Sequence, residues 1–276
     1  MKTKNLIQFV LFTLLLTSCT TTSNFYQVCK TTPEKDIKLI DNFLVYEDDN
    51  CKVLYNIWGN GGNIGFTFLN KTTTNIYINL EECFFVINGN ANNYYKNRVY
   101  SYSTNTSMGQ SVAKSMTGVN YLELVQTNSA AANTISTHGT TVSVNEEKII
   151  CIPSMASKSI KEYNIIQSPY RDCDLLRYPT KKQVKTLSFT KENSPIVYGN
   201  RIEYKIGQTG KTIKLENNFF VSEITNYPES EIIESKRETN CGKESINLYL
   251  LKDYFKNVSP DKFYISYVFD GSEWEH

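Results

Sequence analysis

Short runs in which apolar and polar residues alternate recur along the chain and predict β-strands. Ile76, Ile78 and Leu80 alternate with Tyr77 and Asn79, so that one face of this strand is apolar and the other is more polar. Asn88-Gly89 is the dipeptide that most strongly predicts a tight hairpin, and it separates an apolar run from a second short run at 91–95. At least nine strands are expected, over residues 53–57, 64–68, 76–80, 83–87, 148–152, 184–189, 202–206, 213–221 and 263–269.

Helix signals are few by comparison. Pro228 followed by a row of glutamates predicts a short helix, and the apolar spacing within 245–255 predicts a second one. Short strands with few helices between them are typical of an antiparallel sandwich and not of a parallel sheet covered by helices. We therefore expect an all-β fold, an immunoglobulin-like antiparallel β-sandwich in one domain over residues 37–276, with short helices near the C-terminus.

The strand pattern stops between Arg98 and Glu146. Residues 99–145 hold only two charged side chains, Lys114 and Glu123, and 28 of the 47 residues are Ser, Thr, Asn, Ala or Gly. Such composition is typical of a loop or a low-complexity insertion. We expect this segment to interrupt the sandwich, either as a binding flap or as a solvated excursion between two strands; it can also divide two domains.

The N-terminus has the organisation of a signal peptide. Lys2 and Lys4 precede an apolar run from Leu6 to Leu16, and the small residues Thr17 and Ser18 precede Cys19. Eleven residues of helix rise only about 16 Å, which is too short to cross a bilayer. We therefore predict a signal peptide over residues 1–18.

Leu16-Thr17-Ser18-Cys19 resembles the lipobox of bacterial lipoproteins. The resemblance implies that the chain is cut before Cys19 and that acyl chains on Cys19 anchor it to a membrane, with residues 19–36 as a lipidated tether. Two or three acyl chains suffice for stable anchoring. Thr20 replaces the Asp that retains lipoproteins at the inner membrane, and no acidic residue follows it closely. This favours the outer membrane, and its periplasmic leaflet over the cell surface.

Six cysteines remain beside Cys19, and an even number in an oxidising compartment permits disulfides whose pairing the sequence cannot rank. The alternative for Cys83 and Cys151, which lie in apolar runs, is that they are small buried hydrophobic residues. No C-x-x-C spacing occurs, so neither a zinc ribbon nor a thioredoxin-type centre is expected. The disulfide candidates are Cys29, Cys51, Cys83, Cys151, Cys173 and Cys241.

Composition and motifs exclude several functions. The chain carries 29 Lys and Arg against 28 Asp and Glu, which gives no basic surplus for a nucleic-acid partner. Gly207 to Thr212 ends like a phosphate-binding loop but lies between two predicted strands, so we interpret it as a hairpin turn and expect no nucleotide. The two histidines, His138 and His276, support neither a metal site nor a nucleophilic triad, and no cofactor is expected.

Paired carboxylates leave a hydrolase as an alternative, because glycosidase chemistry needs no histidine. The pairs are Glu81-Glu82, Asp48-Asp49 and Asp172 with Asp174. Asp48-Asp49 is explained most simply as a turn, since the calcium-loop spacing is absent. Asp172 and Asp174 are expected in an exposed loop between two prolines.

Tyrosines near the start of the insertion are candidate binding residues: Tyr94, Tyr95, Tyr100, Tyr102 and Tyr121. Exposed aromatics on a sandwich edge can stack on sugars or receive a partner strand. The alternative is that these tyrosines cover sheet faces, where tyrosine is favoured.

These features, with 19 Tyr and a high Asn content, make the chain similar to bacterial lipoproteins of the Bacteroidota type that carry an immunoglobulin-like domain. The resemblance implies an address and a fold and brings no catalytic residues. We expect a non-catalytic interaction or structural module, anchored in the cell envelope at Cys19, with an envelope protein or glycan as its partner. The alternatives are a carbohydrate- or peptide-binding lipoprotein that uses Tyr94, Tyr95 and the 99–145 loop, and the hydrolase.

Overall fold

The computed structural model describes residues 23–106, 138–237, 239–240, 243–244, 251–269 and 271. Its contacts divide the chain into two units. The sandwich unit comprises the residues up to Tyr94 and those from Ile149 onward, and the insertion unit comprises Tyr95–Lys148. The predicted signal peptide, Cys19, Tyr121, Cys241 and His276 lie outside the described residues.

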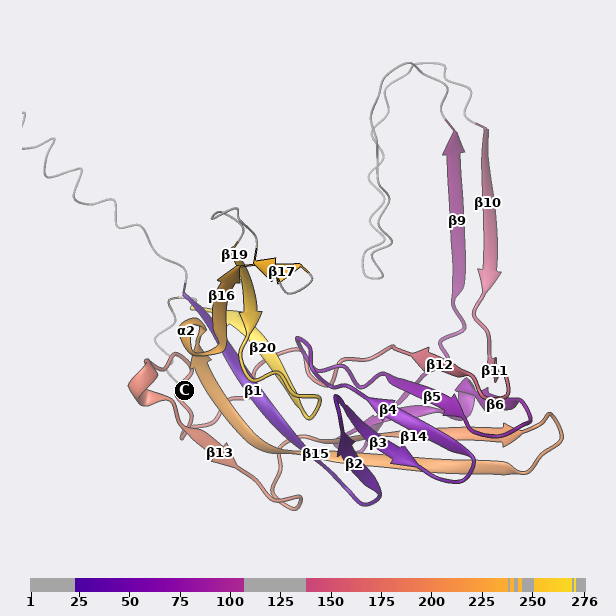
Figure 1. The fold of residues 1–276 in the computed structure, drawn as a ribbon, viewed down its shortest axis with the longest axis horizontal. Coiled ribbons are helices and arrows are strands. Elements are labelled where there is room, and N and C mark those ends of the chain that lie inside the picture. The colour runs from indigo at the N-terminus through magenta and orange to yellow at the C-terminus, as the bar shows by residue number, and fades with distance from the viewer. Residues whose placement is uncertain are drawn as a thin grey trace, which may run out of the picture. The chain divides into compact units, whose positions relative to one another are not determined.

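The larger sheet of the sandwich unit has the antiparallel order β11-β6-β14-β15-β1-β20. Figure 1 shows β14 and β15 as one long hairpin. β7 pairs with β14, β8 with β7, and β13 with β15. The strands are β11 (Ile149–Ile152), β6 (Ile76–Asn79), β14 (Val197–Ile206), β15 (Thr212–Pro228), β1 (Asn24–Pro33), β20 (Lys262–Val268), β7 (Phe84–Ile87), β8 (Asn90–Asn93) and β13 (Thr186–Ser188).

The smaller sheet has five antiparallel strands in the order β12-β5-β4-β3-β2. Four of them are consecutive in the chain, so this sheet is a meander closed by one strand from beyond the insertion. Its strands are β12 (Ser157–Ile160), β5 (Phe66–Asn70), β4 (Cys51–Tyr55), β3 (Phe43–Glu47) and β2 (Ile37–Ile40).

The core lies between the two sheets, where the buried positions of alternating strands meet. Tyr55 on β4 packs edge-on against Phe219 on β15, with ring centroids 5.2 Å apart. Phe68 on β5 packs in the same way against Tyr204 on β14, at 5.3 Å. These contacts join sheet to sheet, so the all-β sandwich is confirmed; the immunoglobulin-like topology stays a prediction.

Turns and short elements complete the sandwich unit. The hairpin at Asn88-Gly89 is confirmed, with positive φ at both residues as such a tight turn requires. The helix after Pro228 is also confirmed, as α2 (Glu229–Ile232). The other elements are the 3₁₀ turns η1 (Leu80–Glu82) and η2 (Lys181–Gln183) and the paired strands β16 (Ile233–Arg237) with β19 (Leu251–Phe255) and β17 (Thr239–Asn240) with β18 (Lys243–Glu244).

Two predictions about these segments are wrong. The tether expected over 19–36 overlaps β1, which lies inside the larger sheet between β15 and β20. The buried positions of β1 include Gln27 and Thr31, so its inward face does not look apolar in the sequence. The helix expected over 245–255 is strand β19 from Leu251 on, because pairing with β16 overrides its helical spacing; residues 245–250 lie outside the described part.

The insertion unit contains a two-stranded antiparallel ribbon. Strands β9 (Val99–Thr106) and β10 (His138–Asn145) pair over their full length, so both ends of the expected 99–145 loop are extended strands. Residues 107–137 between them lie outside the described part. Across the described residues of the whole chain, helices fall short of the length and apolarity that a membrane span needs.

Candidate functional site

The predicted tyrosine surface does not form at Tyr94. Only 2% of Tyr94 is exposed, and its hydroxyl donates a hydrogen bond of 2.7 Å to Oδ1 of Asn200 inside the sandwich. Its ring packs edge-on against Phe66 and Tyr163. Tyr94 is therefore a core residue, as the alternative interpretation held for these tyrosines, and it is not available to a ligand.

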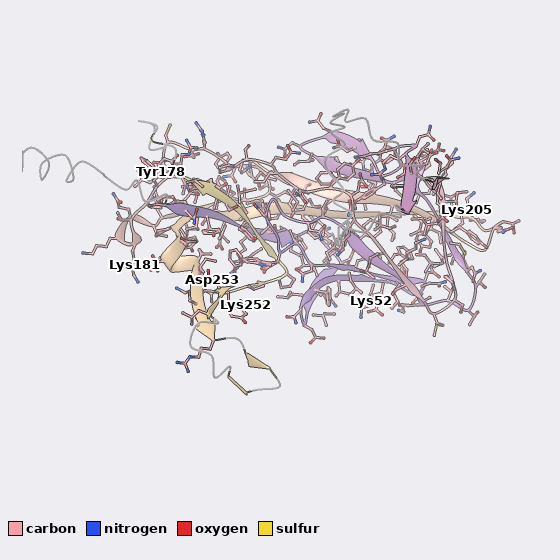
Figure 2. All side chains as sticks on the ribbon, turned by 90° about the horizontal axis from the view of Figure 1, so that it is seen from above. Lys52, Tyr178, Lys181, Lys205, Lys252 and Asp253 are labelled. Carbon is pink, nitrogen blue, oxygen red and sulfur yellow. The ribbon has the colours of Figure 1, made fainter. Side chains whose placement is uncertain are left out.

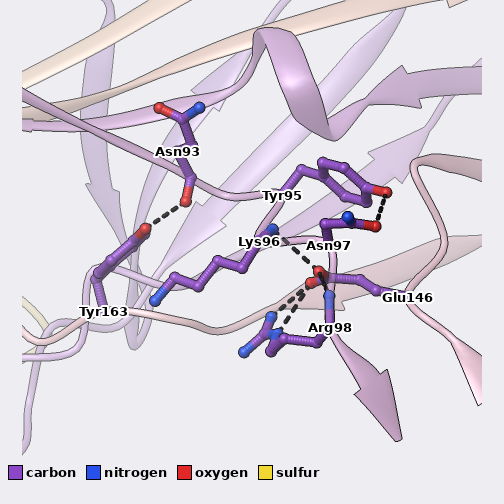
Figure 3. Close-up of polar contacts among 7 residues, drawn as sticks. All are labelled: Asn93, Tyr95, Lys96, Asn97, Arg98, Glu146 and Tyr163. Carbon is purple, nitrogen blue, oxygen red and sulfur yellow. Dashed lines mark hydrogen bonds and ion pairs between the residues drawn. The ribbon is translucent and has the colours of Figure 1, made fainter.

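The other candidate tyrosines belong to the insertion unit. Tyr95 is half-buried and donates its hydroxyl to Oδ1 of Asn97 at 2.9 Å (Figure 3). The guanidinium of Arg98 lies over the ring of Tyr100, 5.8 Å from its centroid. Tyr102 lies in β9, and Tyr121 lies outside the described residues.

Glu146 closes the base of the insertion unit. One of its oxygens accepts the backbone N–H of Lys96 and of Arg98, both at 3.0 Å, and the other accepts the Arg98 guanidinium at 2.6 Å (Figure 3). Burial alone would raise the pKa of Glu146, but these hydrogen bonds outweigh it and hold the pKa below its ordinary value. The carboxylate is structural, because every one of these contacts ties the two chain segments together.

The five described cysteines are free thiols, so none of the disulfides expected of the six cysteines beside Cys19 is formed among these five. Each of two buried thiols has a polar partner of its own: Cys51 lies 3.9 Å from the Tyr204 hydroxyl, and Sγ of Cys83 accepts the Glu203 N–H at 3.3 Å. Cys29 is buried as well, whereas Cys151 and Cys173 are exposed. The alternative of a small buried hydrophobic residue is therefore right for Cys83 and wrong for Cys151.

The carboxylate pairs serve turns. Asp48 accepts the backbone N–H of Asn50 and of Cys51, as expected of a turn before a strand. Asp172 accepts the N–H of Asp174 in the same manner, and Glu81 and Glu82 are the last two residues of the 3₁₀ turn η1. The phosphate-loop-like segment at Gly207 is the turn of the β14–β15 hairpin, as predicted.

One groove in the sandwich unit combines size with two positively charged side chains. It has a volume of about 710 Å³, which lies in the range of small-molecule sites. We call it the arginine groove, because Arg171 and Arg177 line it together with the apolar side chains of Ile166, Pro169 and Ile196. Among the residues that the structure describes, no carboxylate lines this groove.

Buried amides hold the loop that carries the two arginines. Gln27 on β1 is fully buried, and its side-chain amide both donates to the carbonyl of Tyr170 at 2.9 Å and accepts the Tyr170 N–H at 2.7 Å. Asn226 on β15 accepts a hydrogen bond from Gln27 and donates one to the carbonyl of Leu176, both at 2.9 Å. The two strands thus fix the loop at both ends.

The side chains of the loop are also oriented. The Tyr267 hydroxyl donates to the carbonyl of Arg177 at 2.6 Å. The Arg177 guanidinium lies over the ring of Tyr178, 5.0 Å from its centroid, which restricts its direction. The Asp172 carboxylate is turned into the loop, where it accepts the Tyr170 hydroxyl at 3.1 Å. Contacts within the protein therefore orient side chains that line the groove.

A second cavity, of about 370 Å³, lies over β6 and β14. Tyr77, Asn79 and Ile149 line it with the charged side chains of Glu203 and Lys205. Its described lining thus holds one acidic and one basic side chain, and Glu203 also forms an ion pair with Lys214 at 3.4 Å. Figure 2 shows that Lys205, at this cavity, and Tyr178, beside the arginine groove, lie at opposite ends of the sandwich unit.

A third feature is the aromatic cluster of Tyr26, Trp58, Phe255 and Tyr264, all half-buried. Phe255 and Tyr264 are 4.4 Å apart between centroids, and Trp58 lies 5.2 Å from Tyr264. Burial, with the nearby carboxylates of Glu229 and Asp253, raises the pKa of Tyr26. The four rings of this cluster come from four separate chain segments, so part of their role is to hold β19 against the sheet.

Sequence reasoning placed Arg171 in an exposed loop and did not single out Arg177 or Gln27. A polar residue at an inward position of a strand, as Gln27 is on β1, was the available signal that something must satisfy it there. Among the residues that the structure describes, His, Cys, Asp and Glu form no group that could hold a metal ion. Comparisons with protein-family models, with curated proteins and with solved structures each return no match for this chain.

Proposed function

We propose that the chain is a lipid-anchored, non-catalytic binding module of the cell envelope and that the arginine groove is its recognition surface. The anchor rests on the signal-peptide pattern and on Cys19 in the lipobox-like sequence. The module sits at the outer membrane in this proposal, on the periplasmic leaflet.

The observation that carries the binding role is the preformed loop of the arginine groove. Full burial of Gln27 is unfavourable unless its amide is satisfied, and the fold satisfies it by fixing the backbone of Tyr170. A loop ordered in advance loses less conformational entropy when a partner binds. The loop carries two guanidinium groups, Arg171 and Arg177, and guanidinium groups are well suited to recognise polar or anionic groups of a partner.

The anchor is tested by metabolic labelling with a palmitate analogue in a bacterial host that processes lipoproteins. Label on the wild-type chain and none on Cys19→Ala supports the proposal. Equal label on both, or none on either, contradicts it.

The binding role is tested by cross-linking in intact cells, followed by comparison of partners for the wild type, Arg171→Glu and the control Arg201→Glu. Arg201 lies on β14 beside Glu216, and it does not line the groove. Loss of a partner with Arg171→Glu alone supports recognition through the groove. An identical set of partners for all three proteins contradicts it.

A second candidate function, carbohydrate recognition, is favoured by the aromatic cluster. Rings stack on the apolar faces of sugars, and amide or carboxylate groups beside them bind hydroxyls. Asn60 lies next to Trp58 on the segment after β4, with its amide bound to the Ser266 hydroxyl at 3.0 Å. Glycan binding that is lost with Trp58→Ala and kept with Phe43→Ala, an exposed aromatic on β3, would favour this candidate over the first.

A further inference from the structure

We infer that the end of the sandwich unit at which β1 begins docks onto the membrane surface, with the side chains of Val268 and Phe269 in the bilayer interface. We call Val268, Phe269 and Tyr178 the terminal patch. This inference rests on the lipid anchor of the proposed function, because it names a second contact between the same module and its membrane.

The terminal patch contains apolar side chains that the sandwich leaves in solvent. Val268, the last residue of β20, is 45% exposed, and Phe269, the residue after it, is 48% exposed. Single exposed apolar residues are ordinary on protein surfaces, so exposure alone says nothing about a partner. What distinguishes these two residues is how close they lie to the predicted acyl chains.

Backbone hydrogen bonds place the terminal patch beside the predicted anchor. Asn24, the first residue of β1, pairs with Val268. The Phe269 N–H donates to the carbonyl of Ser23 at 3.1 Å. Ser23 follows Cys19 by four residues, and four residues of extended chain span at most about 14 Å. An acylated Cys19 lies at the bilayer surface, so the anchor keeps Phe269 within reach of that surface.

Aromatic packing holds Phe269 in its exposed position. Its ring lies edge-on against that of Tyr178, which Figure 2 labels at this end of the sandwich unit, with centroids 4.8 Å apart. Tyr178 in turn packs against the buried Phe25 at 5.2 Å and against Tyr267 at 6.1 Å. Aromatic rings favour the boundary between lipid and water, and rings that are already packed lose little side-chain entropy there.

Charge contributes less to this contact than apolar area does. Lys181 on η2, at the same end of the sandwich unit (Figure 2), forms an ion pair with Glu231 at 2.9 Å. The Asn24 amide donates to the carboxylate of Glu229 at 3.2 Å. These acidic side chains offset the attraction of a lysine to anionic headgroups. Docking should therefore be similar on zwitterionic and anionic lipids and should change little with salt, unlike a contact made by a basic patch.

Phe43 on β3 offers a matched control, since it is 40% exposed. It precedes Leu44, whose cross-strand partner Tyr55 packs against Phe219. Phe219 pairs with Pro33, the last residue of β1. Because β1 has ten residues and is therefore about 30 Å long, Phe43 lies toward the end of this strand that is far from the predicted anchor.

The test uses the acylated chain, purified from a host that processes lipoproteins and reconstituted in vesicles of phosphatidylethanolamine and phosphatidylglycerol. Phe269→Trp and the control Phe43→Trp each add a fluorophore, and lipids brominated on their acyl chains quench it on contact. The wild type, with its own two tryptophans, gives the background. We expect quenching of the added fluorescence by roughly half or more for Phe269→Trp and by less than roughly a tenth for Phe43→Trp. Vesicles of phosphatidylcholine should give the same result.

A second pair of variants separates docking from mere proximity to the anchor. Val268→Trp reports from the neighbouring position, and Phe269→Asp or Phe43→Asp is added to it. Loss of quenching with Phe269→Asp alone supports docking through the terminal patch. Equal quenching of Phe269→Trp and Phe43→Trp, or quenching of Val268→Trp that Phe269→Asp leaves unchanged, would overturn the inference.

A second copy of the chain is the other occupant that these variants examine. Self-association of the acylated chain in detergent that Phe269→Asp abolishes, without quenching in vesicles, would overturn the inference. Palmitate labelling distinguishes its failure from that of the anchor. Label that Cys19→Ala loses, together with unquenched Phe269→Trp, rejects docking and leaves the anchor standing, whereas a wild-type chain without label contradicts both.

Discussion

The two units of this chain are held together by different interactions. The sandwich unit buries large aromatic side chains such as Tyr55, Phe68 and Phe219 between two sheets. The described side chains of the insertion unit are all exposed or half-buried, and what joins its strands is a backbone ladder with the Glu146 carboxylate at its base. An isolated two-stranded ribbon is marginally stable in water. The free energy of unfolding therefore comes mainly from the sandwich unit, and changes in the sequence of the insertion unit should leave it nearly unchanged.

The largest effect is expected from the core. Phe219→Ala removes a fully buried ring that packs on Tyr55 and Tyr198, and we expect it to lower the free energy of unfolding by about 3–5 kcal/mol. Chemical denaturation measures this. The matched change in the insertion unit, Val144→Ala at a side chain that is 47% exposed, should alter stability by less than about 0.5 kcal/mol. Similar losses for both variants would contradict the contrast between the units.

The neighbouring tyrosines 94 and 95 give a smaller and sharper test. Tyr94→Phe removes the donor to the buried Asn200 and should cost about 1–2 kcal/mol, because an amide oxygen is left without this partner inside the sandwich. Tyr95→Phe removes an exposed hydrogen bond to Asn97 and should change stability little. Thermal unfolding of both variants checks this. An equal shift in Tm for the two variants would contradict the difference in burial between Tyr94 and Tyr95.

The pH dependence of the insertion follows from Glu146. A carboxylate whose pKa is lowered stabilises the structure above the ordinary pKa of glutamate, about 4.3, and this contribution is lost as the pH falls through the lowered pKa. The protection of the Lys96 and Arg98 amides against hydrogen exchange, taken relative to the intrinsic exchange rate at each pH, should therefore fall in acid. In the variant Glu146→Gln, these two amides should exchange faster at neutral pH. Their protection should also no longer change over the pH range in which Glu146 titrates. Global unfolding should change by less than about 1 kcal/mol.

The smallest effect is expected when the insertion is removed. If residues 99–145 are replaced by a four-residue Gly/Asn turn, the Tm of the sandwich should stay within about 2 °C, since none of the buried side chains that the structure describes lies in this segment. Differential scanning calorimetry checks this. A large drop in Tm would show that the insertion contributes to the stability of the sandwich after all.

Much of the fold could be predicted because, in most strands, every second residue is apolar and buried. The pattern at Ile76 to Leu80 predicts β6 and its inward face directly. β1 was not predicted because two of its inward positions, Gln27 and Thr31, are polar. Their side chains form hydrogen bonds only with residues far away in the chain. β19 was predicted as a helix for a related reason, since it forms a strand only by pairing with β16.

The candidate site was harder to predict than the fold. Arg171 and Arg177 lie in one loop of the sequence, but the groove exists because Gln27 and Asn226, from opposite parts of the chain, hold that loop. Local pattern carries no information on such long-range contacts. Tyr94 and Tyr95 show the converse problem, because alternation along a strand says which neighbours differ in burial and not which of them is inside.

The reactivity of three buried thiols, Cys29, Cys51 and Cys83, reports how often the core of the sandwich unit opens. Burial raises the pKa of Cys51 and of Cys83 to about 12 and that of Cys29 further still, so almost no thiolate exists at neutral pH while the sheets stay closed. Among the described cysteines, only Cys151 and Cys173 meet an alkylating reagent in the native protein. Alkylation at Cys29, Cys51 or Cys83, located by peptide mass, then marks a molecule whose core has opened, and its rate measures how often this happens.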